Sequence, residues 1–199
     1  MSSPPRRLDS VCVYCGSSNG ADPTLIAAAA SLGEGLAREG LRLVYGGGGV
    51  GLMGACARAA HLAGGRVLGV IPGFLTAAES PPPMVDTVVV ASMHERKMRL
   101  FEEADAFAVL PGAIGTLEEA IELLSWRRLG LHAKPIVFYN PDGFWGPLFA
   151  LFQQFIDQGL LPAEFAECWR AVAEIAEVVP AIRAMPTSFM SVPGVAALI

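Results

Sequence analysis

Short apolar runs alternate with helical patterns along almost the whole chain, and this alternation constrains the fold more than any other feature of the sequence. Short runs rich in apolar and β-branched residues are typical of buried strands, whereas the segments between them carry apolar residues at helical spacing. The alternation predicts an α/β fold in which helices connect the strands of one parallel sheet. The predicted strands cover residues 11–15, 41–45, 66–71, 86–91, 107–110 and 135–139, the last clear one.

Two capping boxes predict where helices begin. Ser92 and Glu95 have the spacing at which a hydroxyl and a carboxylate each satisfy a backbone N–H of the first turn, so they predict a helix over residues 93–103. Thr116 and Glu119 have the same spacing and predict the start of another helix.

The C-terminal part of the chain has a weaker pattern. Residues 144–159 and 165–185 have helical spacing, with an interruption near Pro162. Residues 186–199 show no periodicity, so we expect a single domain over residues 1–185 followed by a tail that could be disordered.

Composition excludes several classes of protein. The chain has 199 residues, of which 53% are apolar and 17% charged, and this suits one domain with a buried core. A net charge of −5 without a basic run gives no electrostatic footprint for nucleic acid, so we expect no such partner. No apolar stretch is long enough to span a membrane, and the one at residues 11–14 is too short for a signal peptide. We therefore expect a cytoplasmic protein.

The cysteines and histidines predict neither a disulfide framework nor a metal site. The four cysteines are too few and too scattered for a disulfide framework in a chain of this length. Cys12 and Cys15 have a Cys-x-x-Cys spacing, but they lie within an apolar run that resembles a buried strand. The three histidines lack the paired spacing of zinc ligands.

Two glycine-rich segments lie where a predicted strand passes into a predicted helix. The first is 46–54, GGGGVGLMG, and the second is 111–119, PGAIGTLEE. A helix start exposes unpaired N–H groups and the positive end of the helix dipole, and glycine lets a phosphate approach them. Both segments therefore predict phosphate binding, although the glycines of either could instead only allow close packing of helix on sheet. In the first segment, the predicted binding residues are Gly47, Gly48, Gly49 and Gly51.

The ligand of these segments is predicted to be a monophosphate, instead of a dinucleotide or a nucleoside triphosphate. Gly49, Gly51 and Gly54 match the dinucleotide fingerprint, but residues 41–78 contain no acidic residue that could bind a ribose hydroxyl. Neither segment is followed by the Lys-Ser or Lys-Thr of a triphosphate-binding loop.

Arg96 and Lys97 lie between the two segments on the first turns of a predicted helix. A cationic pair beside an anion site suggests ligand binding, but the pair could equally belong to a solvated helix face on which Arg99 pairs with Glu103. Glu119 also has two interpretations, since it could be half of a capping box or a carboxylate near a bound ribose.

Taken together, GGGGVGLMG, MHERK at residues 93–97 and PGAIGTLEE resemble the cytokinin-activating phosphoribohydrolases, the Lonely Guy family, long labelled possible lysine decarboxylases. The resemblance covers about residues 10–160, including CGSS at residues 15–18. It implies a Rossmann-like, doubly wound parallel sheet flanked by helices. It also implies hydrolysis of the N-glycosidic bond of adenine-type nucleoside 5′-monophosphates to free base and ribose 5-phosphate, by a homodimer.

The resemblance also implies roles for individual residues. Arg96 and Glu119 would be the catalytic pair. The implied substrate-binding residues are Glu79, Lys97, Gly112, Ala113, Ile114, Gly115, Thr116, Leu117, Glu118 and Ser125. Ala113 departs from the family, which has glycine there; if the position requires a positive φ, alanine costs about 1 kcal/mol, and its methyl group could crowd the phosphate.

These residue types suit the chemistry. Departure of the base leaves the ribose positively charged, so the Glu119 carboxylate can stabilise that charge or orient the attacking water. Arg96 stays protonated, so it can hold the phosphate or ribose or polarise the leaving purine, but it cannot act as a base. No metal or other cofactor is required.

Other functions remain open from the sequence. A decarboxylase would need pyridoxal phosphate on Lys97 or Lys134, the two lysines of the chain. A non-catalytic nucleotide-binding or carrier protein on the same fold would have no need of Glu119. Among hydrolases, AMP and N6-prenylated AMP are not distinguished as substrates.

Overall fold

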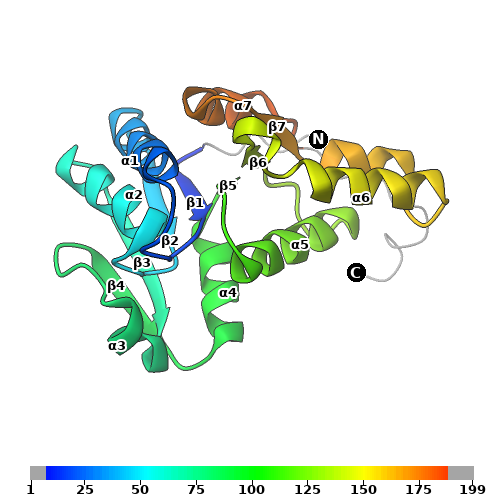
Figure 1. Ribbon diagram of the computed structural model, residues 1–199. Helices are drawn as coiled ribbons and strands as arrows, with labels where there is room; N and C mark the ends of the chain where they lie inside the picture. Colours follow the sequence, from blue (N-terminus) through cyan, green and yellow to red (C-terminus); the bar gives the residue numbers. More distant parts are fainter. Residues whose placement is uncertain (1–7, 188–199) are drawn as a thin grey trace, which may run out of the picture.

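Seven parallel strands form one sheet in the computed structural model, which describes residues 8–187 (Figure 1). The order of the strands is β4-β3-β2-β1-β5-β6-β7, so the predicted α/β fold with a doubly wound parallel sheet is confirmed. The strands are β1 (Ser10–Tyr14), β2 (Arg42–Tyr45), β3 (Val67–Pro72), β4 (Asp86–Val90), β5 (Ala106–Val109), β6 (Ile136–Tyr139) and β7 (Arg170–Val172).

The connections between the strands are mostly helical, as the alternating pattern predicts. The α-helices are α1 (Pro23–Arg38), α2 (Gly51–Leu62), α3 (Thr76–Glu79), α4 (Met93–Glu103), α5 (Ile114–Arg128), α6 (Gly146–Asp157) and α7 (Val178–Ala184). Short 3-10 helices are η1 (Gly73–Leu75), η2 (Pro141–Gly143), η3 (Ala163–Cys168) and η4 (Ile175–Glu177).

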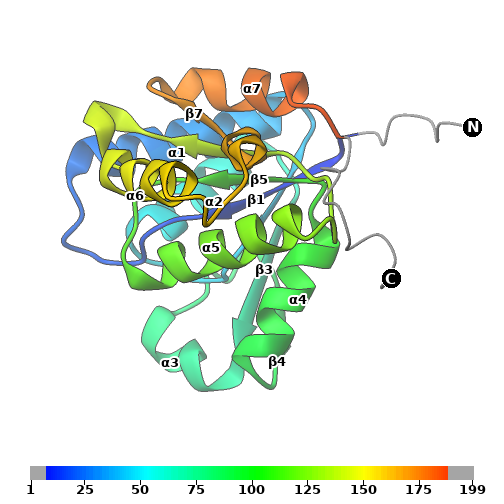
Figure 2. The same ribbon diagram turned by 90° about the vertical axis from the view of Figure 1, so that its right-hand side faces the viewer.

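Helices cover both faces of the sheet, with α1, α2 and α7 on one face and α4, α5 and α6 on the other (Figures 1 and 2). Successive residues of a strand point to opposite faces. Val11 and Val13 of β1 accordingly pack into the core beneath α1 and α2, whereas Cys12 and Tyr14 pack into the core beneath α5. The strands β1, β2, β3, β5 and β6 therefore contribute to two hydrophobic cores, one on each face of the sheet.

The two halves of the sheet meet between β1 and β5. From β1 the chain continues outward through β2, β3 and β4, and it then returns to place β5 on the other side of β1. At such a switch point the loops after the two central strands separate, and a crevice opens beyond their carboxyl ends. The loops concerned are residues 15–22 and 110–113.

The N-cap half of the first predicted capping box is confirmed, whereas the carboxylate of its Glu95 accepts from Ala91 instead of Ser92, and the second box is wrong. The Ser92 hydroxyl accepts a hydrogen bond from the Glu95 N–H at 3.1 Å, and the Glu95 carboxylate accepts one from the N–H of Ala91 at 2.8 Å. By contrast, α5 begins before Thr116, with Ala113 at its N-cap and no side-chain cap. Glu119 is consequently a buried residue inside the helix, not its cap.

The predicted helix over residues 165–185 is confirmed only at its end, where α7 lies, and is wrong for the residues before it, which include β7. Trp169 stacks on Phe149 of α6 with the ring centroids 5.5 Å apart, and it also contacts the rings of Phe152 and Phe165. This aromatic cluster holds the chain beside β6, where the free edge of the sheet pairs with the short strand β7. Tertiary packing thus overrides the helical spacing, and β7, not β6, is the last strand within residues 8–187.

The predicted tail, 186–199, lies outside the described residues from 188 onward. Its first residue, Pro186, accepts a hydrogen bond from the Arg127 guanidinium at 3.2 Å. Among residues 8–187 no helix is both long and apolar enough to cross a membrane.

Helices α1 and α2 pack closely enough to require glycine at one position, which provides a test of the fold. A Cβ at Gly33 would lie 2.1 Å from the Cys56 carbonyl oxygen, so we expect Gly33→Ala to lower the free energy of unfolding by about 1–3 kcal/mol. Gly35 lies in the same helix with nothing near its Cβ position, so Gly35→Ala should raise it by about 0.5–1 kcal/mol. Urea unfolding measures both, and equal effects of the two substitutions would contradict this packing.

Candidate active site

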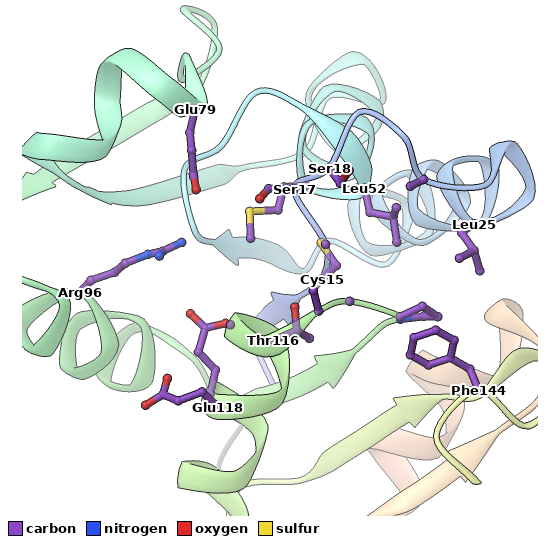
Figure 3. Close-up of a pocket in the computed structure, with 18 of the residues that line it drawn as sticks. Cys15, Ser17, Ser18, Leu25, Leu52, Glu79, Arg96, Thr116, Glu118 and Phe144 are labelled. Carbon is purple, nitrogen blue, oxygen red and sulfur yellow. The ribbon is translucent and has the colours of Figure 1, made fainter. Parts of the chain in front are cut away.

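A cavity of about 460 Å³ opens at the switch point, beyond the carboxyl ends of β1 and β5. Its two ends differ in chemistry (Figure 3). Glu79 and Arg96 lie together at one end, with Glu119 also in the lining, whereas Leu25 and Phe144 lie at the opposite end. The cavity therefore offers a charged end and an apolar end to one ligand.

Three helices supply the charged side chains. Arg96 comes from the first turn of α4, Glu79 is the last residue of α3, and Glu119 lies in the second turn of α5. These helices follow three different strands, so only the assembled sheet brings the side chains together. The structure thus places both predicted catalytic residues in the lining of one cavity.

Arg96 is only 5% exposed and is held by few partners. Its Nη2 donates a hydrogen bond to the Gly46 carbonyl oxygen at 3.0 Å, and its Nη1 lies 3.9 Å from the Met93 sulfur. Its Nε has no hydrogen-bond partner among residues 8–187. A buried guanidinium with an unused N–H is suited to bind an oxygen or nitrogen atom of a ligand.

Glu119 is 6% exposed, and its environment favours the protonated form. Burial raises the pKa of this carboxyl from 4.5 to about 7, although the positive charge of Arg96 opposes the shift. Glu118 and Glu79 add smaller upward contributions to the pKa, and Lys97 a smaller downward one. A carboxyl with a pKa near neutrality can both give and take a proton at physiological pH.

Glu79 has a buried oxygen that is also without a partner. Its backbone carbonyl accepts a hydrogen bond from the N–H of Gly49 at 2.7 Å, which ties the end of α3 to the first glycine-rich segment. Its Oε2 is buried and finds no donor in the described part of the chain. A ligand N–H or O–H at the charged end of the cavity would satisfy it.

The second glycine-rich segment forms a wall of the cavity. Gly112, Ala113, Gly115 and Thr116 line it, at the start of α5, where the first backbone N–H groups lack helical partners. A Cβ at Gly112 would lie 2.2 Å from the Thr116 hydroxyl oxygen, so this position requires glycine. This helix start is the better-formed anion site of the two that the sequence predicts.

Ala113 does not have the conformation for which glycine would be needed. Its φ is −93° and its ψ is −154°, an extended conformation that alanine adopts without strain. The positive φ considered from the sequence is therefore absent, and so is its energetic cost.

The glycines of the first glycine-rich segment contact protein atoms instead of the cavity, although Leu52 and Met53 of the same segment line it. The residues that line the cavity do not include Gly47, Gly48, Gly49 or Gly51. Gly47 and Gly51 have positive φ values of 81° and 58°, so both turns depend on glycine. Direct phosphate binding by these four residues remains a prediction.

Several other predicted binding residues lie outside the cavity lining. Lys97 donates to Glu118 at 2.6 Å and to Glu122 at 3.0 Å, and Ser125 is exposed further along α5. Ile114 is 78% exposed, and Leu117 packs against the core beneath α5. Substrate binding by Lys97, Ile114, Leu117 and Ser125 remains a prediction. The ion pair that the sequence offers on the exposed face of α4 is present, with Nη2 of Arg99 lying 2.7 Å from Oε1 of Glu103.

Sequence reasoning did not assign the apolar end of the cavity or the loop after β1. Cys15, Gly16, Ser17 and Ser18 line the cavity, and their position directly after the first strand was a usable signal. Phe144 and Leu25 carry no such signal, because both lie in segments whose position depends on the assembled sheet.

The cysteines and histidines show no sign of redox or metal chemistry. Cys12 and Cys15 are buried on opposite faces of the sheet, and burial raises the pKa of both thiols, whereas a redox Cys-x-x-Cys requires a lowered thiol pKa. Burial also lowers the pKa of His132 to about 4. No group of three or more potential metal ligands occurs within residues 8–187.

Comparison with known proteins identifies the class to which this fold and site belong. The family model described as "Possible lysine decarboxylase" matches residues 53–182. The chain is 44% identical over 156 residues to a cytokinin riboside 5′-monophosphate phosphoribohydrolase of Arabidopsis thaliana, covering 78% of this chain and 72% of the relative. It is 45% identical over 157 residues to a probable enzyme of the same name from Oryza sativa, covering 78% and 69%. The chain belongs to this family, and the resemblance seen in the sequence is confirmed.

Solved structures show the same fold in more distant proteins. The molybdenum cofactor binding protein of Rippkaea orientalis matches with a TM-score of 0.66 and 24% identity, over 89% of this chain and 97% of that one. The Moco carrier protein of Chlamydomonas matches with a TM-score of 0.67 and 20% identity, over 90% and 98%. At this identity the likeness concerns the fold alone.

The buried carboxyl predicts a pH-dependent effect of Glu119→Gln on stability. Because Glu119 binds its proton more tightly in the folded state, wild-type stability falls relative to the variant as pH rises from about 4.5 to about 7. Above pH 7 we expect the free energy of unfolding of Glu119→Gln to exceed that of wild type by about 3 kcal/mol, the equivalent of this pKa difference. Below pH 4.5 the two free energies should be equal.

Urea titrations across this pH range measure the difference. Glu102→Gln, at an exposed position on α4, controls for the loss of one surface charge. A difference between Glu119→Gln and wild type that stays constant with pH would contradict the burial of an ionisable Glu119.

Proposed function

We propose that this protein hydrolyses the N-glycosidic bond of adenine-type nucleoside 5′-monophosphates, releasing the free base and ribose 5-phosphate. The observation that carries the proposal is the position of Arg96 and the buried Glu119 in one cavity, beside the anion site at the start of α5. The names of the relatives support the same reaction on cytokinin riboside 5′-monophosphates.

The start of α5 sets the geometry of the reaction. A phosphate bound at its free N–H groups would be anchored at the end of the substrate that does not react. Glu119 lies five residues after Ile114, or about 7.5 Å along the helix axis, which suits a carboxylate beside C1′ of the ribose. Binding of the phosphate thus orients the bond that breaks.

Glu119 and Arg96 have complementary tasks in this reaction. The C1′–N9 bond breaks, its electron pair leaves with the base, and water adds its oxygen to C1′. Ionised Glu119 stabilises the positive charge on the ribose or accepts the proton of the attacking water. Arg96 stays protonated, so it donates hydrogen bonds to the phosphate, the ribose or the leaving purine, which acquires a proton as it departs. The reaction needs no metal or other cofactor.

The arrangement of the two lysines argues against a decarboxylase. A pyridoxal phosphate enzyme needs a lysine amine that is free to form a Schiff base. Lys97 is paired with Glu118 and Glu122, and Lys134 donates to the Phe101 carbonyl oxygen while lying 3.9 Å from the centre of the Phe101 ring. Neither lysine belongs to the lining of the cavity.

A non-catalytic carrier is the second candidate, because the matched Moco proteins have this fold. A binding site gains nothing from a buried carboxyl with a pKa near 7, whereas a hydrolase does. We therefore favour the hydrolase. We further propose a cytoplasmic homodimer with no nucleic acid partner, and AMP as well as N6-prenylated AMP as candidate substrates.

Chromatographic detection of free base and ribose 5-phosphate tests the proposal. We expect wild-type protein to release both from AMP or isopentenyladenosine monophosphate, and Glu119→Gln to lower kcat by about 10²–10⁴-fold, because the group that handles the proton is gone.

Glu102→Gln, on the exposed face of α4, serves as the matched control and should retain wild-type activity. Tight binding of nucleotide by wild-type protein without release of base would favour the carrier. Equal activity of Glu119→Gln and wild type would overturn the assigned role of Glu119.

A further inference from the structure

We propose that the start of the first glycine-rich segment, here called the seat, holds Arg96 and Glu79 in position. Within it, Gly46 is a positioning residue for Arg96 and not part of a phosphate site. This inference rests on the proposed function, because its consequence is the placement of a catalytic side chain. Here the seat means residues 46–49, which connect β2 to the start of α2.

The first support is the contact between Gly46 and the guanidinium. A Cβ at Gly46 would lie 2.1 Å from Nη2 of Arg96 and 3.2 Å from its Cζ, so any side chain there would displace Arg96. The carbonyl oxygen of the same residue accepts the hydrogen bond from Nη2 at 3.0 Å. Gly46 therefore both makes room for the guanidinium and fixes its direction.

The second support is the contact between the seat and α3. A Cβ at Gly48 would lie 2.9 Å from Oε2 of Glu79, and one at Gly49 would lie 2.1 Å from the Ser80 carbonyl oxygen. The N–H of Gly49 donates to the Glu79 carbonyl oxygen. Glycine at these positions lets the end of α3 dock on the seat, so Glu79 reaches the charged end of the cavity opposite Arg96 (Figure 3).

The third support is that the seat is already occupied by protein. A Cβ at Gly47 would lie 2.9 Å from Cβ of Ile71, which closes another side of the segment. The N–H of Gly49, which a phosphate would need, is used by Glu79. None of residues 46–49 belongs to the lining of the cavity, whereas Ala113, Gly115 and Thr116 do. The two glycine-rich segments thus have different roles. Residues 46–49 position side chains, and the segment at residues 111–119 is available to bind the anion.

A double-mutant cycle, measured by the rate of base release, distinguishes positioning of Arg96 from phosphate binding as the role of this segment. If Gly46 acts through Arg96, Gly46→Ala should lower kcat by about 10–100-fold while KM changes less than about threefold, because the anion site at α5 is untouched. In the Arg96→Ala background, Gly46→Ala should change the residual kcat by less than about twofold. If the segment instead bound the phosphate, Gly46→Ala would raise KM strongly and by the same factor in wild type and in Arg96→Ala. That result would overturn the proposal.

A second cycle, on urea unfolding, needs no substrate. The guanidinium that Gly46→Ala would strike is absent from Arg96→Ala, so we expect Gly46→Ala to shift the unfolding midpoint downward in wild type and much less in Arg96→Ala. If Gly46→Ala fails to fold, recovery of folded protein in the double variant supports the seat, and failure in both backgrounds refutes it. A protein that shows this rescue but releases no base would retain the seat and lose the proposed function, so the two failures are distinguishable.

Discussion

The rest of this site depends on the balance between two influences on the Glu119 carboxyl, its burial and the positive charge of Arg96. Burial alone would keep the carboxyl protonated, and a strong ion pair would keep it ionised. The arrangement falls between these limits, because no ion pair joins the two side chains in the described part of the chain, yet Arg96 still lowers the pKa that burial raises. A pKa of about 7 follows, and with it a group that can exchange protons at neutral pH.

The sheet topology makes this arrangement possible. The switch point between β1 and β5 opens a crevice, and helices from both halves of the sheet direct side chains into it. The start of α5 supplies backbone N–H groups for an anion and, in the following turn, Glu119. In the proposed reaction, the helix whose start would hold the phosphate therefore also carries the carboxyl that would act at the reactive end of the substrate. Arg96 approaches from α4, which the capping pair Ser92 and Glu95 starts at the required residue.

The sequence was sufficient to predict most of the fold because parallel strands, capping pairs and glycine-rich turns are local patterns. The resemblance to the family, and not the spacing of the residues, selected Arg96 and Glu119, which the structure brings to one cavity. The distinction between the two glycine-rich segments could not be predicted, because glycine shows that something approaches the backbone but not whether it is a ligand or, as at Gly46, a guanidinium. The strand β7 was missed because the packing of Trp169 on Phe149, and not local spacing, determines it.

The ionisation of Glu119 is the central claim, and carbon NMR of side-chain carboxyl groups measures it directly. The Glu119 resonance can be assigned as the signal lost in Glu119→Gln. The structure predicts that this resonance titrates with a midpoint near pH 7 in the protein without ligand. A midpoint near the ordinary glutamate value of 4.5 would show that Glu119 is solvated and fully ionised, and it would contradict the account of the site given by its burial.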